Sequence, residues 1–320
     1  MDDILFSLNA VLPLLLLISV GYLIRRLHIV NIEFLEVGNR FVFRIAMPIL
    51  LCRNIYRTNF SEAFDPGLAA FAVGGIFVLA LLTALIAPRF VHNRQSIGTI
   101  IQAIYRGNFI LFGLPLAINL FGTVGAAPTS MLFAFTIPTY NLLAVLVLTI
   151  YSAEYDKDPG SLMKNMGPVV LDILKNPLII GSAAGFLLAV MPFEIPIFLD
   201  KTFSDIGGLA TPLALIILGA QFDFEQLRGR LRVAVITSLA RLILAPAFIV
   251  TIAVLIGFRG PKLGAIYILS AAPTAVSSYI MAKDMKSDHV LAGQLVILTT
   301  IMCGVTLFAG IYLLRVLRLI

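Results

Sequence analysis

Charged residues are scarce in this sequence of 320 residues. Only 12% are Asp, Glu, Lys or Arg, while 60% are hydrophobic, and the mean hydropathy is +1.01. A soluble domain has about a quarter charged residues and slightly under half apolar ones. The composition therefore argues against a soluble domain and predicts an all-α polytopic membrane protein.

Cysteine is also scarce, and common enzyme motifs are absent. The two cysteines, Cys52 and Cys303, form no CxxC pair, so we expect neither a disulfide framework nor a zinc site. No HExxH or GxSxG motif and no intramembrane aspartate pair is present, which argues against an enzyme such as an intramembrane protease. The net charge of +6 comes from basic residues between apolar runs. It indicates membrane topology and no nucleic-acid partner.

Long uncharged runs mark the expected spans, since a membrane helix needs about 20 apolar residues. Clear runs are 4–24, 66–88, 176–193, 263–282 and 290–314. The run 107–153 has room for two helices, with the turn marked by "LFGTVGAAP" and Pro128. The run 242–258 reaches full length if Arg241 lies inside the membrane, and 38–55 and 206–222 are weaker. Together they predict ten transmembrane helices.

An internal repeat organises these helices. "PLLLLISVGYL" at 13–23 aligns with "PLIIGSAAGFL" at 177–187, and "AMPIL" at 46–50 aligns with "ATPLA" at 210–214, both at a shift of 164 residues. Five helices per copy is an odd number, so the second copy enters the membrane inverted, as in many secondary transporters. We expect a first repeat at 1–155, a cytoplasmic linker at 156–168 and a second repeat at 169–320.

The distribution of basic residues predicts the orientation. One set of connections holds twelve basic residues: Arg25, Arg26, Arg89, Arg94, Lys157, Lys164, Lys175, Arg228, Arg230, Arg232, Lys283 and Lys286. The other side holds seven: Arg53, Arg57, Lys201, Arg259, Lys262, Arg315 and Arg318. The positive-inside rule then places both termini outside the cytoplasm.

Two helices contain helix breakers at membrane depth. "GNFILFGLPLA" at 107–117 places the break of helix 4 around Gly113 and Pro115, and "LSAAPTAVSSYIMAK" at 269–283 places Pro273 inside helix 9. Each proline frees the carbonyl four residues back, at Leu111 and Leu269. Lipid cannot satisfy such carbonyls. Paired interruptions in the two halves therefore indicate a binding site, although a simple proline kink is the alternative.

These two segments carry a family resemblance. Asn108, Gly113 and Pro115 in helix 4, and "AAPTAVSSYIMAKDMKSDHVLAGQLVILTT" at 271–300, resemble the auxin efflux carrier family, in its short-loop bacterial form. The resemblance implies the fold of sodium/bile-acid symporters, with helices 4 and 9 crossing at the midplane. Helices 3–5 and 8–10 would form a mobile transport domain beside a scaffold of helices 1, 2, 6 and 7. It also implies organic-anion substrates, either auxin or dicarboxylates such as malate and malonate.

The residues around the breaks suit an anion. Half-helix N-termini near Pro115 and Thr274 would offer free N–H groups to a carboxylate. Asn108, Thr274, Ser277 and Ser278 add hydrogen-bonding groups. Arg106 and Arg241 fall near the midplane, where an arginine suggests function. An arginine that only snorkels or pairs with a carbonyl is the alternative.

The coupling of transport stays open at this stage. No acidic residue lies in the broken stretches, which disfavours a mechanism based on a central carboxylate pair. Sodium held by hydroxyls and by the Leu111 and Leu269 carbonyls, a proton relay through Glu36 or Asp223, and uncoupled transport all remain. A sodium-coupled symporter of another organic acid and an ion channel or sensor are the alternative functions. "GSAAG" at 181–185 suits close helix packing or a dimer contact. A homodimer in the cell inner membrane is an expectation from the fold.

Overall fold

Helices account for nearly all of the structure, a computed structural model that describes residues 2–57, 65–151, 171, 174–191, 195–221 and 224–320. In the first half the helices are α1 (Asp2–Arg26), α2 (Ile32–Phe41), α3 (Met47–Tyr56), α4 (Pro66–Ile86), α5 (Arg94–Tyr105), α6 (Phe109–Phe121) and α7 (Thr123–Ile150). In the second half they are α10 (Pro177–Val190), α11 (Ile197–Gly208), α12 (Ala210–Ala220), α13 (Phe224–Leu239), α14 (Ala245–Ile256), α15 (Gly260–Ala271), α16 (Ser277–Asp284) and α17 (His289–Val316).

Several expected spans consist of two consecutive helical pieces. The π turns Val42–Ala46 and Ala240–Leu244 join α2 to α3 and α13 to α14. Five stretches of the described residues are long and apolar enough to cross a membrane: Pro66–Arg89, Met131–Ile150, Ile197–Ala220, Leu231–Ile256 and His289–Val316. The chain is therefore a helical multi-pass membrane protein. The number of ten spans and the inverted orientation of the second half stay predictions, and the linker 156–168 lies outside the described residues.

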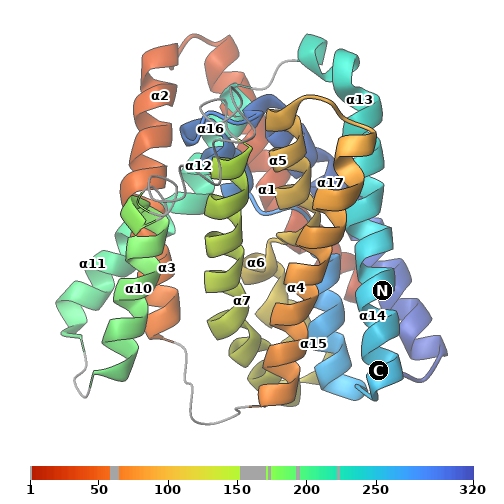
Figure 1. Cartoon of the computed structure of the whole chain (residues 1–320). Helices are drawn as coiled ribbons and strands as arrows, with labels where there is room; N and C mark the ends of the chain where they lie inside the picture. The colour runs from red at the N-terminus through yellow and green to blue at the C-terminus, as the bar shows by residue number, and fades with distance from the viewer. Residues whose placement is uncertain (1, 58–64, 152–170, 172–173, 192–194, 222–223) are drawn as a thin grey trace.

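Two groups of helices lie side by side in Figure 1. The helices α3, α10 and α11 lie on one side, and α4, α14, α15 and α17 lie on the other, with α7 between them. Within the first group, α10 and α11 pack on α3, while α12 packs along α1. Within the second group, α4, α5 and α6 pack on α7, and α13 packs on α17. The pieces α5, α6, α7 and α16 belong to this second group, in which α6 also packs on α15 and α16 packs on α17.

Glycines bring the helices of the first group into backbone contact. A Cβ built on Gly21 would lie 2.1 Å from the carbonyl oxygen of Ile216, and one on Gly185 would lie 2.6 Å from that of Cys52. The same shift of 164 residues relates Gly21 to Gly185 and Cys52 to Ile216. The "GSAAG" segment therefore packs within one chain, since Gly181 also lies against Pro48.

The turn between α6 and α7 lies at Gly122. Its φ of +64° belongs to the left-handed region that glycine tolerates, and α7 begins at the next residue. Pro128 was expected to mark this turn, but it lies inside α7. The glycine, rather than the proline, ends the preceding helix.

Candidate functional site

Two short non-helical segments interrupt the stretches predicted from the sequence to be helices 4 and 9. The first separates α5 from α6 at 106–108, and the second separates α15 from α16 at 272–276. Gly107 and Thr274 form an antiparallel β-bridge. The Asn108 N–H donates to the Pro273 carbonyl at 2.7 Å, and the Ala275 N–H donates to the Arg106 carbonyl at 3.2 Å. The two breaks thus satisfy part of each other's backbone, which lipid could not do.

The first break is displaced from its expected position. It was predicted around Gly113 and Pro115, but α6 runs continuously from Phe109 to Phe121 through both residues. The helix therefore begins at Phe109 rather than near Pro115. In the second break, α16 begins at Ser277 rather than near Thr274. The pairing of the two breaks explains the first shift, because the bridge requires extended backbone at Gly107.

The side chain of Arg241 forms hydrogen bonds to the backbone next to both breaks. Its side chain is fully buried, at 0% exposure. Nε donates to the Ala272 carbonyl at 3.0 Å, Nη1 to the Ile104 carbonyl at 2.8 Å and Nη2 to the Leu269 carbonyl at 3.4 Å. Leu269 is the residue whose carbonyl Pro273 was expected to free. Arg241 therefore serves as a hydrogen-bond donor to the C-terminal ends of α5 and α15.

Gly107 leaves space for this arginine. A Cβ built on Gly107 would lie 2.1 Å from Nη2 of Arg241 and 3.2 Å from the Leu269 carbonyl oxygen. The first distance is far below a normal van der Waals contact, and the second is near its lower limit. Any larger residue at 107 would have to displace either the guanidinium or the bridge.

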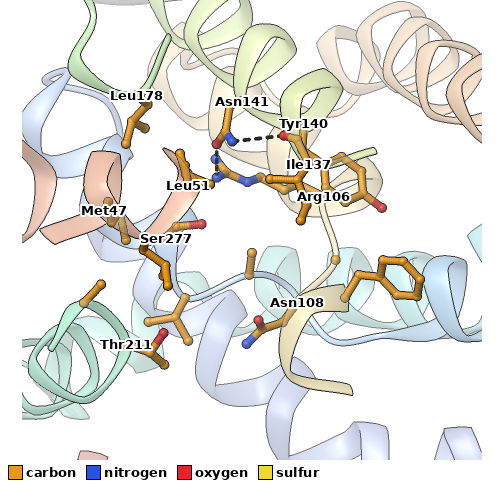
Figure 2. A pocket seen from close by; sticks show the side chains of 16 residues that line it. Met47, Leu51, Arg106, Asn108, Ile137, Tyr140, Asn141, Leu178, Thr211 and Ser277 are labelled. Atoms are coloured by element: carbon orange, nitrogen blue, oxygen red, sulfur yellow. Dashed lines mark hydrogen bonds between the residues drawn. The ribbon is translucent and has the colours of Figure 1, made fainter. Parts of the chain in front are cut away.

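A cavity of about 70 Å³ lies in front of the crossing. Residues of both breaks and of α7 line one side: Arg106, Gly107, Asn108, Phe109, Ile137, Tyr140, Asn141, Ala275, Val276 and Ser277. Residues of α3, α10 and α12 line the other: Met47, Leu50, Leu51, Leu178, Ala210 and Thr211. In Figure 2, Met47 and Thr211 lie across the cavity from Arg106 and Asn141. The cavity therefore lies between the two helix groups.

Arg106 brings a positive charge to this cavity. Its side chain is buried, with Nη2 donating to Oδ1 of Asn141 at 2.7 Å and Nη1 donating to the Met281 thioether. Asn141 is held in turn by a bond from its amide nitrogen to the Ile137 carbonyl at 2.9 Å. Among the described residues, no carboxylate lies within ion-pair distance of Arg106. A buried guanidinium with only neutral partners is suited to an anion.

Asn108 and Ser277 add polar groups at two helix starts. Asn108 occupies the N-cap position of α6, but its side chain makes no capping hydrogen bond. Because Asn108 also lines the cavity, its amide faces the space that a ligand would occupy. Ser277 lines the cavity at the start of α16, where the N–H groups of Ser278 and Tyr279 already donate to Ala275 and Val276. The N-terminus of α6 is thus the better anion-binding helix end.

Other predicted site residues lie away from the cavity lining. The Thr274 hydroxyl donates to the Ala103 carbonyl at 3.2 Å, and its N–H donates to the Thr299 hydroxyl at 3.0 Å. Ser278 is buried at 2% exposure, and Gly113 packs against Phe109 and Phe133. Pro273 and Arg241 are also absent from the residues that line this cavity, and both belong to the crossing itself. The side chains of Leu111 and Pro115 lie outside the described part of the structure.

Three of the lining residues missed from the sequence carry polar side-chain groups: Tyr140, Asn141 and Thr211. Asn141 carried the clearest signal, since an amide inside the uncharged run 107–153 must find a buried partner. Nothing in the sequence singled out Thr211, although it is the second residue of the repeat segment "ATPLA".

The chain is similar to known transporters over most of its length. The family model described as "Membrane transport protein" matches residues 6–309. A protein of Methanocaldococcus jannaschii, named an uncharacterized transporter, is 24% identical over 92% of this chain and 95% of its own. One of Methanothermobacter thermautotrophicus with the same kind of name is 23% identical, over 94% and 96%. A protein of Rhizobium meliloti, provisionally named a malonate transporter, is 25% identical over 95% of each chain.

Proposed function

Because this chain belongs to the membrane transport protein family, we propose that it is a secondary transporter of small organic anions rather than merely a membrane transporter. The family match agrees with the resemblance to auxin efflux carriers and with a transporter rather than an enzyme. The observation that carries the proposal is Arg106, a buried guanidinium that lines a cavity and, among the described residues, bonds only Asn141 and Met281.

The cavity favours a small acid over a bulky one. A buried water needs roughly 10–15 Å³ of such space, so about 70 Å³ holds on the order of five waters. A three- or four-carbon carboxylate matches this size better than the aromatic ring system of auxin. The name of the Rhizobium meliloti relative supports the same class. One carboxylate would bind Arg106 and Asn108, with its carbon chain against Met47, Leu51 and Ile137.

Transport would require the cavity to open alternately to the two sides of the membrane. Its walls come from two helix groups, so a shift of the α4–α7 and α13–α17 group along the other would carry the site across. This elevator motion rests on the location of the cavity between the groups. Ten spans, the inverted repeat and extracytoplasmic termini belong to the same proposal.

Binding measurements on the purified protein test the role of Arg106. We expect malonate or malate to bind the wild type and to bind Arg106→Met at least tenfold more weakly, because the charge-assisted bonds are lost. Arg89→Met is the matched control, since Arg89 is exposed and donates to the Leu85 carbonyl at the neighbouring end of α4. Equal affinity of Arg106→Met and wild type would refute the proposal. Saturable, counterflow-capable uptake into proteoliposomes distinguishes a carrier from a channel.

A further inference from the structure

Three backbone oxygens from the two broken helices converge on one point. The Ile104 carbonyl belongs to the end of α5, the Leu269 carbonyl belongs to the last turn of α15, and the Ala272 carbonyl follows α15. Helix C-termini carry partial negative charge, so bringing two of them together is unfavourable without a cation. Oxygen donors gathered in this way are also the ligands that hard metal ions prefer.

A guanidinium already occupies this position. Each of the three nitrogen atoms of Arg241 donates to one of the three oxygens, at 3.0, 2.8 and 3.4 Å. The fold implied by the family resemblance includes sodium-coupled symporters, and the Leu269 carbonyl was one candidate sodium ligand among the coupling alternatives left open by the sequence. The donor set does not fit a sodium ion, because Arg241 uses the oxygens that the ion would need.

The surroundings are adapted to the arginine. Gly107 provides the space for Nη2, since a Cβ there would lie 2.1 Å from that atom. Among the described residues, no Asp or Glu forms an ion pair with Arg241. The positive charge is therefore balanced by the helix ends themselves, as an inorganic cation would be in that position.

We propose that Arg241 is a tethered cation, a positioning residue that replaces an inorganic coupling ion at the helix crossing. This proposal rests on the proposed carrier function, because it describes how the carrier assembles its anion site. The crossing is assembled permanently by Arg241, and Arg106 and Asn108 are in place without sodium. Anion binding then needs no sodium ion at this position.

Thermal unfolding without any organic anion tests this role. We expect the melting temperature of the wild type to be the same in sodium chloride and in potassium chloride at equal ionic strength. Arg241→Ala should melt several degrees lower, because three buried carbonyls lose their donor. Millimolar guanidinium chloride should restore part of that loss. It should not raise the melting temperature of wild type or of Arg232→Ala, whose exposed arginine lies on α13.

Two results would overturn the proposal: a higher melting temperature of the wild type in sodium than in potassium, or Arg241→Ala as stable as the wild type. The first comparison needs no variant, so it decides the matter even if Arg241→Ala fails to fold. The assay contains no organic anion. Failure of anion recognition by Arg106 would therefore leave it unaffected, and the two proposals fail separately.

Discussion

Arg106 and Arg241 are both buried at the same helix crossing, yet their surroundings differ. Arg241 has three carbonyl partners and no exposure, and it is absent from the cavity lining. Arg106 has one amide and one thioether and lines the cavity. A thioether is a weak acceptor, so Arg106 retains donor capacity that Arg241 has used. The number and kind of partners, rather than depth in the membrane, separates a structural arginine from a ligand-binding one.

The largest expected effect is that of Gly107→Ala. Its Cβ would lie 2.1 Å from Arg241 Nη2, so the guanidinium or the β-bridge must move. We expect loss of transport in proteoliposomes together with a lower melting temperature. Gly74→Ala is the matched control, because a Cβ on Gly74 meets nothing within 4 Å. If Gly107→Ala transported normally, the tight fit of Arg241 at the crossing would be wrong.

A second substitution changes the partner of Arg106 without removing the arginine. Asn141→Asp places a carboxylate 2.7 Å from the guanidinium, where it would compete with a substrate carboxylate. We expect malonate affinity to fall about tenfold, which corresponds to about 1.4 kcal/mol. Asn141→Ala only removes a neutral acceptor and should cost less. Titration calorimetry measures both, and the reverse order of the two variants would contradict a substrate anion at Arg106.

Two hydroxyl groups, that of Thr274 in the second break and that of Ser277 at the start of α16, should also differ in role. Ser277 lines the cavity, whereas the Thr274 hydroxyl donates to the Ala103 carbonyl inside the crossing. Ser277→Ala should therefore weaken malonate binding a few-fold with little change in melting temperature. Thr274→Val should lower the melting temperature by an amount that corresponds to about 1 kcal/mol of lost hydrogen bonding. Indistinguishable variants would remove the distinction between lining and structural residues.

The smallest effect is expected where a cation is exposed. Lys262 donates to Asp65 at 2.6 Å, and its side chain is 55% exposed. This hydrogen bond and one from the Leu68 N–H lower the pKa of Asp65. Because the pKa is lowered on folding, the Asp65–Lys262 pair stabilises the fold fully above the pKa of the unfolded carboxyl, near 4. This stabilisation is lost as the pH falls through the pKa of the folded state. Asp65→Asn should cost under about 1 kcal/mol at pH 7.

The difference between Asp65→Asn and wild type should shrink towards pH 3. Melting curves at several pH values measure it. A difference that grew on acidification would contradict the lowered pKa. Asp65→Asn removes the charged partner of the exposed Lys262, whereas Arg241→Ala removes a buried cation. The difference between their melting temperatures shows how much less an exposed cation contributes to stability.

Sequence reasoning located the crossing but not its internal geometry. Pro273 and the polar residues after it predicted the second break, whereas Asn108 was predicted to lie near the first break and is in fact part of it. The first break itself was placed at Pro115, although α6 tolerates that proline. The break depends on Gly107, which accommodates a guanidinium from residue 241. A contact across 134 positions leaves no local pattern.

The roles of the two arginines show the same limit. Both stood out in the sequence as charges at membrane depth, and both were assigned to the site. Only the acceptors around each one distinguish them, and those acceptors are mostly backbone carbonyls, which every residue possesses. The carbonyls of Ile104 and Ala272 thus could not be anticipated from residue type.

The glycine contacts between helices also restrict which positions can vary. Gly219 and Gly21 lie against the carbonyl oxygens of Ile18 and Ile216, where a Cβ would approach to 1.9 and 2.1 Å. The contacted groups are main-chain atoms, which every amino acid has in common. A substitution at 18 or 216 leaves such a contact in place, whereas a substitution at either glycine removes it. We therefore expect positions 18 and 216 to tolerate many substitutions and positions 21 and 219 to tolerate few. A saturation library of these four positions would measure the difference.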